Sequence, residues 1–172
     1  MDSNLRRILS VVVVAIVVGA FFQPFQGDAA PQSSGRITGT WRVHMTPRNC
    51  QTGAPLPPFD FLVSFARGGT LTEVINAQAF SPGQRTTGLG LWSHVQSNTY
   101  KSVSEAFILF DSPTTLPGFK RGSQRLSWDI QVDGNQATIE SAGQFLDSDG
   151  NLIVPTCASG VGTRFEGAQD ED

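Results

Sequence analysis

The sequence is poor in the residues from which many catalytic, metal and nucleic-acid sites are built. It has two histidines and two cysteines, which are too few for a zinc site if the cysteines pair with each other. The net charge of -3 offers no basic stripe that could neutralise the phosphates of a nucleic acid. The sequence has no Gly-x-Ser-x-Gly nucleophile elbow, and its glycine pairs do not precede a helix as a phosphate-binding loop would. We therefore expect no nucleic-acid partner, no metal and no cofactor.

Long apolar runs are also absent, apart from one near the N-terminus. Residues 8–22 are largely apolar, follow Arg6 and Arg7, and precede a polar stretch with small residues. These are the three parts of a secretory signal, and the run is shorter than the roughly 20 apolar residues that cross a bilayer. We predict a signal peptide that is cleaved after Ala29, and the alternative is an uncleaved membrane anchor formed by residues 8–22. Both predict export, to the periplasm, the cell envelope or the extracellular space.

The rest of the chain has the length of one domain. The composition divides it into a linker at residues 30–35, a folded domain at residues 36–166 and an acidic tail at residues 167–172.

The folded part lacks helical periodicity. From Arg36 onward, apolar residues recur at every second position, and clusters of Gly, Pro, Asn and Asp interrupt the pattern. This predicts an all-β domain with eight strands, at residues 37–45, 59–66, 70–76, 87–95, 99–111, 126–133, 136–146 and 152–165. We expect a break in the last strand near Pro155.

The connections between these strands alternate in length. Three of them are tight turns, with the sequences RGG, QSN and DGN, and longer loops alternate with them. In an antiparallel up-and-down order, all the short turns share one end and all the long loops share the other. Closure into a barrel would remove the exposed sheet edges. We predict an eight-stranded antiparallel up-and-down barrel with one plain end and one elaborated mouth, and the alternative is a β-sandwich.

The two cysteines lie where such a barrel would close. Cys50 follows the first predicted strand, and Cys157 lies early in the last one, so both are expected at the mouth. In an oxidising compartment they would form a disulfide that links the first strand to the last. Closing a loop of about 100 residues could contribute roughly 4 to 5 kcal/mol by chain entropy. The alternative is two buried free thiols.

One short motif in the first strand resembles a known family. Gly39, Thr40 and Trp41 resemble the Gly-x-Trp motif of lipocalins and the wider calycin group, and Arg164 resembles the basic residue that lies across that tryptophan. A cation stacked on an indole is physically reasonable at a closed barrel end. The chain lacks a second lipocalin motif of the Thr-Asp-Tyr kind and a C-terminal helix, so it resembles a calycin-like bacterial relative. The alternative is that Trp41 is an ordinary core residue and Arg164 a surface one.

The resemblance implies a barrel floor and a lumen for a small hydrophobic molecule. The floor would consist of Gly39, Trp41 and Arg164. An eight-stranded barrel is wide enough either to be filled by side chains or to hold one small ligand. The residues expected to line the lumen are Phe61, Val63, Phe65, Trp92, Phe107, Trp128 and Ile130.

Candidates for catalysis are few. His44 falls on a polar strand face, whereas His94 shares a face with glycines that would leave room in a lumen. Glu105 alternates with apolar residues, so it could be a buried acid with a raised pKa. Its neighbours in the other phase form an equally good inner face, in which case Glu105 is solvated.

The sequence therefore favours an exported lipocalin-like barrel that binds a small hydrophobic ligand over an enzyme. One alternative is a small barrel isomerase or cyclase that uses Glu105 and His94. Another is an interaction module of the cell envelope with a filled barrel. A lumen above roughly 300 Å³ would argue against the last alternative. The direction of Glu105 would separate a binder from an enzyme.

Overall fold

A computed structural model describes residues 37–111 and 120–165, and within them the chain forms eight strands and no helix. The predicted signal or anchor, the linker and the acidic tail lie outside the described residues. No helix in the described part is long and apolar enough to cross a membrane. The strands are β1 (Gly39–Arg48), β2 (Phe59–Phe65), β3 (Thr70–Asn76), β4 (Gly88–Gln96), β5 (Thr99–Ile108), β6 (Gly122–Asp133), β7 (Gln136–Asp147) and β8 (Leu152–Arg164).

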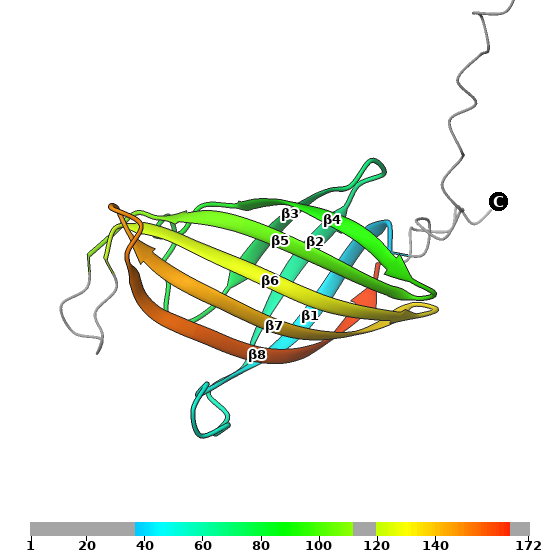
Figure 1. Cartoon of the computed structure of the whole chain (residues 1–172), viewed down its shortest axis with the longest axis horizontal. Helices are drawn as coiled ribbons and strands as arrows, with labels where there is room; N and C mark the ends of the chain where they lie inside the picture. The colour runs from blue at the N-terminus through cyan, green and yellow to red at the C-terminus, as the bar shows by residue number, and fades with distance from the viewer. Residues whose placement is uncertain (1–36, 112–119, 166–172) are drawn as a thin grey trace, which may run out of the picture. The chain divides into compact units, whose positions relative to one another are not determined.

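The strands form a closed barrel in sequence order. Each strand pairs antiparallel with the next, and β8 pairs with β1 over a register that runs from Trp41 opposite Arg164 to Arg48 opposite Cys157 (Figure 1). Closure leaves no unpaired edge along the paired length of the sheet. The predicted up-and-down barrel is confirmed, and a β-sandwich is excluded.

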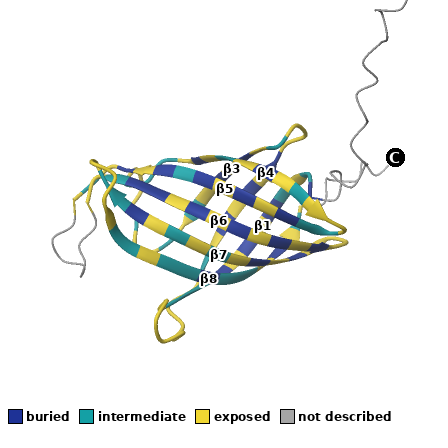
Figure 2. Cartoon of the chain, in the orientation of Figure 1, coloured by how far each residue is buried: buried dark blue, intermediate teal, exposed yellow. Residues whose placement is uncertain are grey.

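The inside and outside of the barrel follow the period-two pattern of the sequence. Along β6, Leu126, Trp128, Ile130 and Val132 are buried and the residues between them are exposed. Figure 2 shows the same alternation of buried and exposed residues on the neighbouring strands. The side chains that point inward form one apolar core.

The two ends of the barrel differ as the loop lengths predict. Strands β4 and β5, and likewise β6 and β7, are joined by two-residue turns, in which Ser97 and Gly134 adopt φ values of 49° and 58°. Positive φ is typical of the tight turns that match the twist of a hairpin. The longer connections, including residues 49–58 and 77–87, lie at the opposite end, which we call the mouth.

Several predicted strand limits differ from those of the structure, and the expected break in the last strand is absent. Strand β6 begins at Gly122 instead of residue 126, because Ser123 and Gln124 are buried polar residues that do not extend the apolar pattern. Strand β5 ends at Ile108 instead of residue 111. Strand β8 runs through Pro155 without a break. Pro155 pairs with β7 but precedes the part of β8 that pairs with β1, so no N–H donor is needed toward β1 at this position.

The predicted disulfide is confirmed. Cys50, in the β1–β2 loop, is bonded to Cys157 in β8, with the two Cα atoms 5.3 Å apart. Cys157 pairs with Arg48 at the end of β1, so the bond links the two strands that close the barrel. A disulfide indicates an oxidising, non-cytoplasmic compartment.

Candidate functional site

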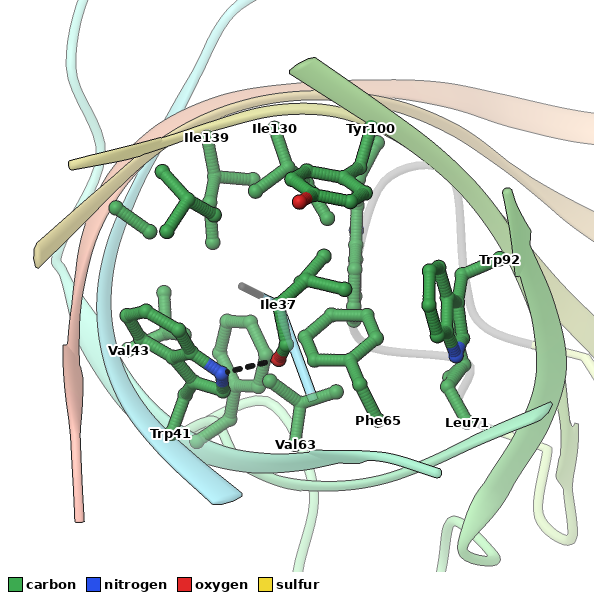
Figure 3. Close-up of a cluster of buried hydrophobic side chains, with 14 of the residues drawn as sticks. Ile37, Trp41, Val43, Val63, Phe65, Leu71, Trp92, Tyr100, Ile130 and Ile139 are labelled. Carbon is green, nitrogen blue, oxygen red and sulfur yellow. Dashed lines mark hydrogen bonds between the residues drawn. The ribbon is translucent and has the colours of Figure 1, made fainter. Parts of the chain in front are cut away.

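The end of the barrel opposite the mouth is filled by side chains, and we call this part the closed half. Figure 3 shows Ile37 in the middle of a ring of inward-pointing residues, with the indole Nε1 of Trp41 donating a hydrogen bond to the Ile37 carbonyl oxygen over 2.8 Å. The space between these side chains holds no volume for a water molecule. Three of the predicted lumen residues, Val63, Phe65 and Ile130, belong to this packed region.

The predicted floor residues lie together at this end. The Arg164 guanidinium is 4.2 Å from the centre of the Trp41 ring, and it donates hydrogen bonds to the Thr38 carbonyl and to Asn135 Oδ1. Burial lowers the pKa of Arg164. Gly39 has a φ of 117°, and a Cβ there would lie 3.2 Å from Arg164 Nη1. A glycine therefore meets both the backbone conformation and the close approach of the arginine.

The mouth half of the barrel contains a cavity of about 340 Å³. Phe61 and Trp128, two more of the predicted lumen residues, line it with their ring centres 5.3 Å apart. The described residues that line it include no formally charged side chain. They are Met45, Pro47, Leu56, Pro57, Pro58, Phe59, Phe61, Ile75, Ala77, Gln78, Ala79, Phe80, Gln124, Leu126, Trp128, Ser141, Phe145, Thr156, Cys157 and Ala158.

Small side chains on β7 and β8 leave this space open. Strand β7 directs Ile139 into the packed closed half and Ser141 toward the cavity. Strand β8 contributes Ala158 to the same wall. Protein interiors are close-packed wherever side-chain volume suffices, so a wall of small residues opposite aromatic ones leaves an unfilled volume.

Two mouth loops border the cavity. The β1–β2 loop contributes Leu56 and two prolines, and the β3–β4 loop (residues 77–87) contributes Phe80. The Phe80 ring centre lies 6.2 Å from that of Phe145 on β7 and 6.3 Å from that of Phe110. These aromatic contacts hold the β3–β4 loop against the mouth.

A buried ion pair holds the same loop from inside the barrel. Arg85 donates to Glu73 on β3 through Nη2 to Oε1 at 2.6 Å and Nη1 to Oε2 at 3.3 Å, and through Nε to Gln124 Oε1 on β6 at 2.7 Å. The side chains of Arg85 and Glu73 are 3% and 0% exposed. Each charge therefore has its partner without water, which a buried charge requires.

Small residues between β3 and β6 make room for the arginine. Glu73 pairs with Gly88 on β4, and Gln124 pairs with Ala106 on β5. A Cβ placed on Gly88 would lie 1.9 Å from Glu73 Oε1. Glycine at this position is therefore required by the buried carboxylate.

Two further predicted lumen residues, besides the three in the closed half, also lie away from the cavity. Phe107 is 63% exposed, so its placement in the lumen is wrong; it lies on the outer face, as do the exposed residues Leu89, Leu91 and Val103. Both faces of β5 carry apolar residues near its end, so alternation alone does not fix which of them points inward. Trp92 is buried in the closed half, with its ring centre 6.3 Å from that of Phe65 and 5.9 Å from that of Tyr100.

The catalytic candidates do not form a common site. Glu105 points outward and pairs with Arg125 at 3.0 Å, and hydrogen bonds from Ser123 and Arg125 lower its pKa instead of raising it. Glu105 pairs with Leu89, whereas His94 lies five residues further along β4, beside Tyr100 and with Nε2 3.0 Å from the Ser97 carbonyl oxygen. Of the two alternatives for Glu105, the structure therefore agrees with the solvated one.

The sequence did not identify Gln124 in the cavity wall or the two residues, Arg85 and Glu73, that lie behind it. Glu73 lies between Leu71 and Ile75 on an apolar strand face, which is a signal that could have identified a buried carboxylate. Gln124 fell in a predicted loop, and Arg85 in another, so neither gave a signal. The described interior also holds three fully covered polar atoms without a partner, Ser102 Oγ, Ser104 Oγ and Trp128 Nε1.

Comparisons with known proteins add little to this geometry. No protein-family model matches the chain, and no curated protein matches it. The crystal structure of Rv2717c from M. tuberculosis is similar with a TM-score of 0.40 at 16% identity, covering 81% of this chain and 100% of that one. A similarity of this size carries no argument about function, which therefore depends on the cavity itself.

Proposed function

We propose that this protein is an exported, calycin-like barrel that binds a small apolar ligand in the cavity of its mouth half. The observation that supports this most is the cavity of about 340 Å³ with aromatic walls, which lies above the packed centre of the closed half. Small-molecule sites are typically apolar clefts of about 300 to 1,000 Å³ with a few polar groups. The cavity falls at the lower end of that range, which suits a ligand of up to three rings or a short chain.

The closed end and the disulfide support the other parts of the proposal. The Arg164 guanidinium over Trp41, with Gly39 beside it, supports the barrel floor that the calycin resemblance implies. The Cys50–Cys157 bond and the signal-like N-terminal sequence both favour export. The outward direction of Glu105 removes the main support for the isomerase or cyclase alternative.

A binding titration with a neutral fluorescent probe tests the proposal. N-phenyl-1-naphthylamine is an uncharged two-ring-system compound that fluoresces more strongly in apolar surroundings. Ala158→Phe would fill part of the cavity, and Val161→Phe on the outer face of the same strand is the matched control. We expect saturable binding to the wild type and to Val161→Phe. For Ala158→Phe we expect an affinity that is lower by a factor of about ten or more.

Two outcomes would contradict the proposal. The first is no saturable binding to the wild-type protein, either of this probe or of a co-purifying small molecule in native mass spectrometry. The second is equal affinity of the wild type and Ala158→Phe, which would place the bound probe elsewhere.

A further inference from the structure

The cavity wall contains a polar side chain, Gln124, whose orientation is fixed by a hydrogen bond from Arg85. Gln124 is nine-tenths buried and lines the cavity. Its Oε1 accepts a hydrogen bond from Arg85 Nε at 2.7 Å. Arginine has donors only, so the amide must direct its oxygen toward Arg85 and its NH₂ group away from it.

The amide nitrogen of Gln124 is left free to bind a ligand. Gln124 Nε2 has no hydrogen-bond partner among the described residues. It is also not one of the three polar atoms of the described interior that are fully covered and unpaired. Because the side chain lines the cavity and this nitrogen is not fully covered, a ligand in the cavity can approach it.

Resting on the function proposed above, we propose that the ligand carries an uncharged acceptor oxygen, such as a ketone or an ester carbonyl, that Gln124 Nε2 binds. An apolar ligand without an acceptor would bury these N–H donors without a partner, which is unfavourable. A carbonyl group would satisfy one of them while the rest of the ligand contacts Phe61 and Trp128.

The charges around the cavity favour a neutral ligand over an anion. Arg85 is the cation nearest to Gln124, but Glu73 binds it through both carboxylate oxygens. No formally charged side chain lines the cavity among the described residues. A carboxylate ligand would therefore be desolvated without a free cation to compensate it. Trp128 Nε1 is also an unpaired donor, but it is fully covered and thus not presented to a ligand.

Three probes of one shape test this inference by displacement of N-phenyl-1-naphthylamine. 2-Acetylnaphthalene has a carbonyl group, 2-ethylnaphthalene lacks it, and 2-naphthoate carries a negative charge. The measured quantity is the ratio of the affinities of the acetyl and ethyl compounds. Gln124→Glu, at pH 8, keeps an oxygen for Arg85 and removes the NH₂ group, whereas Gln124→Met removes both. Gln131→Glu, exposed on the outer face of β6, is the matched control.

We expect the affinity ratio to fall about tenfold in both Gln124 variants and to stay unchanged in Gln131→Glu. We also expect 2-naphthoate to bind most weakly to the wild type. An unchanged ratio in both variants would overturn the inference and leave the proposed function standing, since both neutral probes would still bind. Tightest binding of 2-naphthoate, or displacement by none of the three, would also overturn it. Failure of N-phenyl-1-naphthylamine itself to bind would overturn the proposed function.

A measurement on the wild type does not depend on the folding of any variant. In a ¹H–¹⁵N spectrum, the Gln124 side-chain NH₂ signals should shift with the acetyl compound and shift much less with the ethyl compound. Equal shifts with both compounds would contradict a hydrogen bond from Gln124.

Discussion

The two halves of the barrel interior are built from the same strands but differ in how completely they are packed. In the closed half, Ile37 and Trp41 fill the centre, and the space between them and their neighbours holds no volume for a water molecule. In the mouth half, aromatic side chains face small residues, and a cavity of about 340 Å³ remains. The difference shows how one sheet can serve two purposes, because its closed half supplies stability and its mouth half can leave space for a ligand.

The polar groups are distributed as unevenly as the volume. Arg164 closes one end from outside the core by stacking on Trp41. At the other end, Arg85 is buried inside the barrel between Glu73 and Gln124 and connects a mouth loop to the inner wall. The structure of the mouth half is therefore stabilised in part by a buried ion pair, whereas that of the closed half is stabilised by apolar packing.

The largest effect is expected from breaking the buried pair that holds the mouth loop. Arg85→Met leaves the Glu73 carboxylate buried without a partner, and this should lower the free energy of unfolding by about 3 to 5 kcal/mol. Urea unfolding at pH 7 measures the loss. The double variant Glu73→Leu/Arg85→Met should recover most of it, because no isolated charge remains. A double variant no more stable than Arg85→Met would contradict the ion-pair explanation.

A matched pair of phenylalanines compares the two halves directly. Phe65 and Phe61 are both on β2 and both 3% exposed, but Phe65 borders the packed region and Phe61 the cavity. Phe65→Ala should lower the free energy of unfolding by about 3 to 5 kcal/mol and leave the affinity for the probe unchanged. Phe61→Ala should cost less, because one side of the ring already lacks contacts, and should weaken binding. The same unfolding and probe titrations on both variants give the comparison, and equal effects would count against it.

Removing the disulfide should affect the mouth half more than the closed half. Cys50→Ala/Cys157→Ala should lower the stability by about 2 to 4 kcal/mol. Because the bond joins the β1–β2 loop to β8 at the mouth, amide hydrogen exchange should accelerate first near Ala158. Exchange of the amides near Ile139 in the closed half should accelerate only as much as the loss of global stability requires. Uniform acceleration in both halves would indicate that the bond acts on the barrel as a whole.

The smallest effect is expected from Glu105, which belongs to neither half. Its pKa is lowered below 4.5 by hydrogen bonds from Ser123 and Arg125, so its stabilising contribution is present at neutral pH and is lost as the pH falls through the folded-state pKa. Since the pair is exposed, Glu105→Gln should cost less than about 1 kcal/mol at pH 7. The difference should vanish in unfolding measurements at strongly acid pH. A variant that changes probe binding would show that Glu105 acts on the cavity after all.

The sequence predicts the fold better than it predicts the site. Period-two alternation and alternating loop lengths are local signals, and they identify the eight strands, the closed barrel and the disulfide. Phe107 was misplaced because both faces of that strand segment are apolar. The pairing of Arg85 with Gln124, 39 positions apart, depends on how the loop folds into the barrel, and no local pattern encodes that. The cavity volume is the small difference between the volume that the barrel encloses and the volume of the side chains inside it, so the sequence alone does not determine it.

The position of a bound probe tests the central claim most directly. With isoleucine δ1 methyl groups labelled, a ¹H–¹³C spectrum reports on Ile75 in the cavity wall and on Ile37 and Ile139 in the closed half. On saturation with N-phenyl-1-naphthylamine, the Ile75 signal should shift, and those of Ile37 and Ile139 should stay in place. Binding that shifts Ile37 or Ile139 and leaves Ile75 unchanged would contradict a packed closed half below an open mouth.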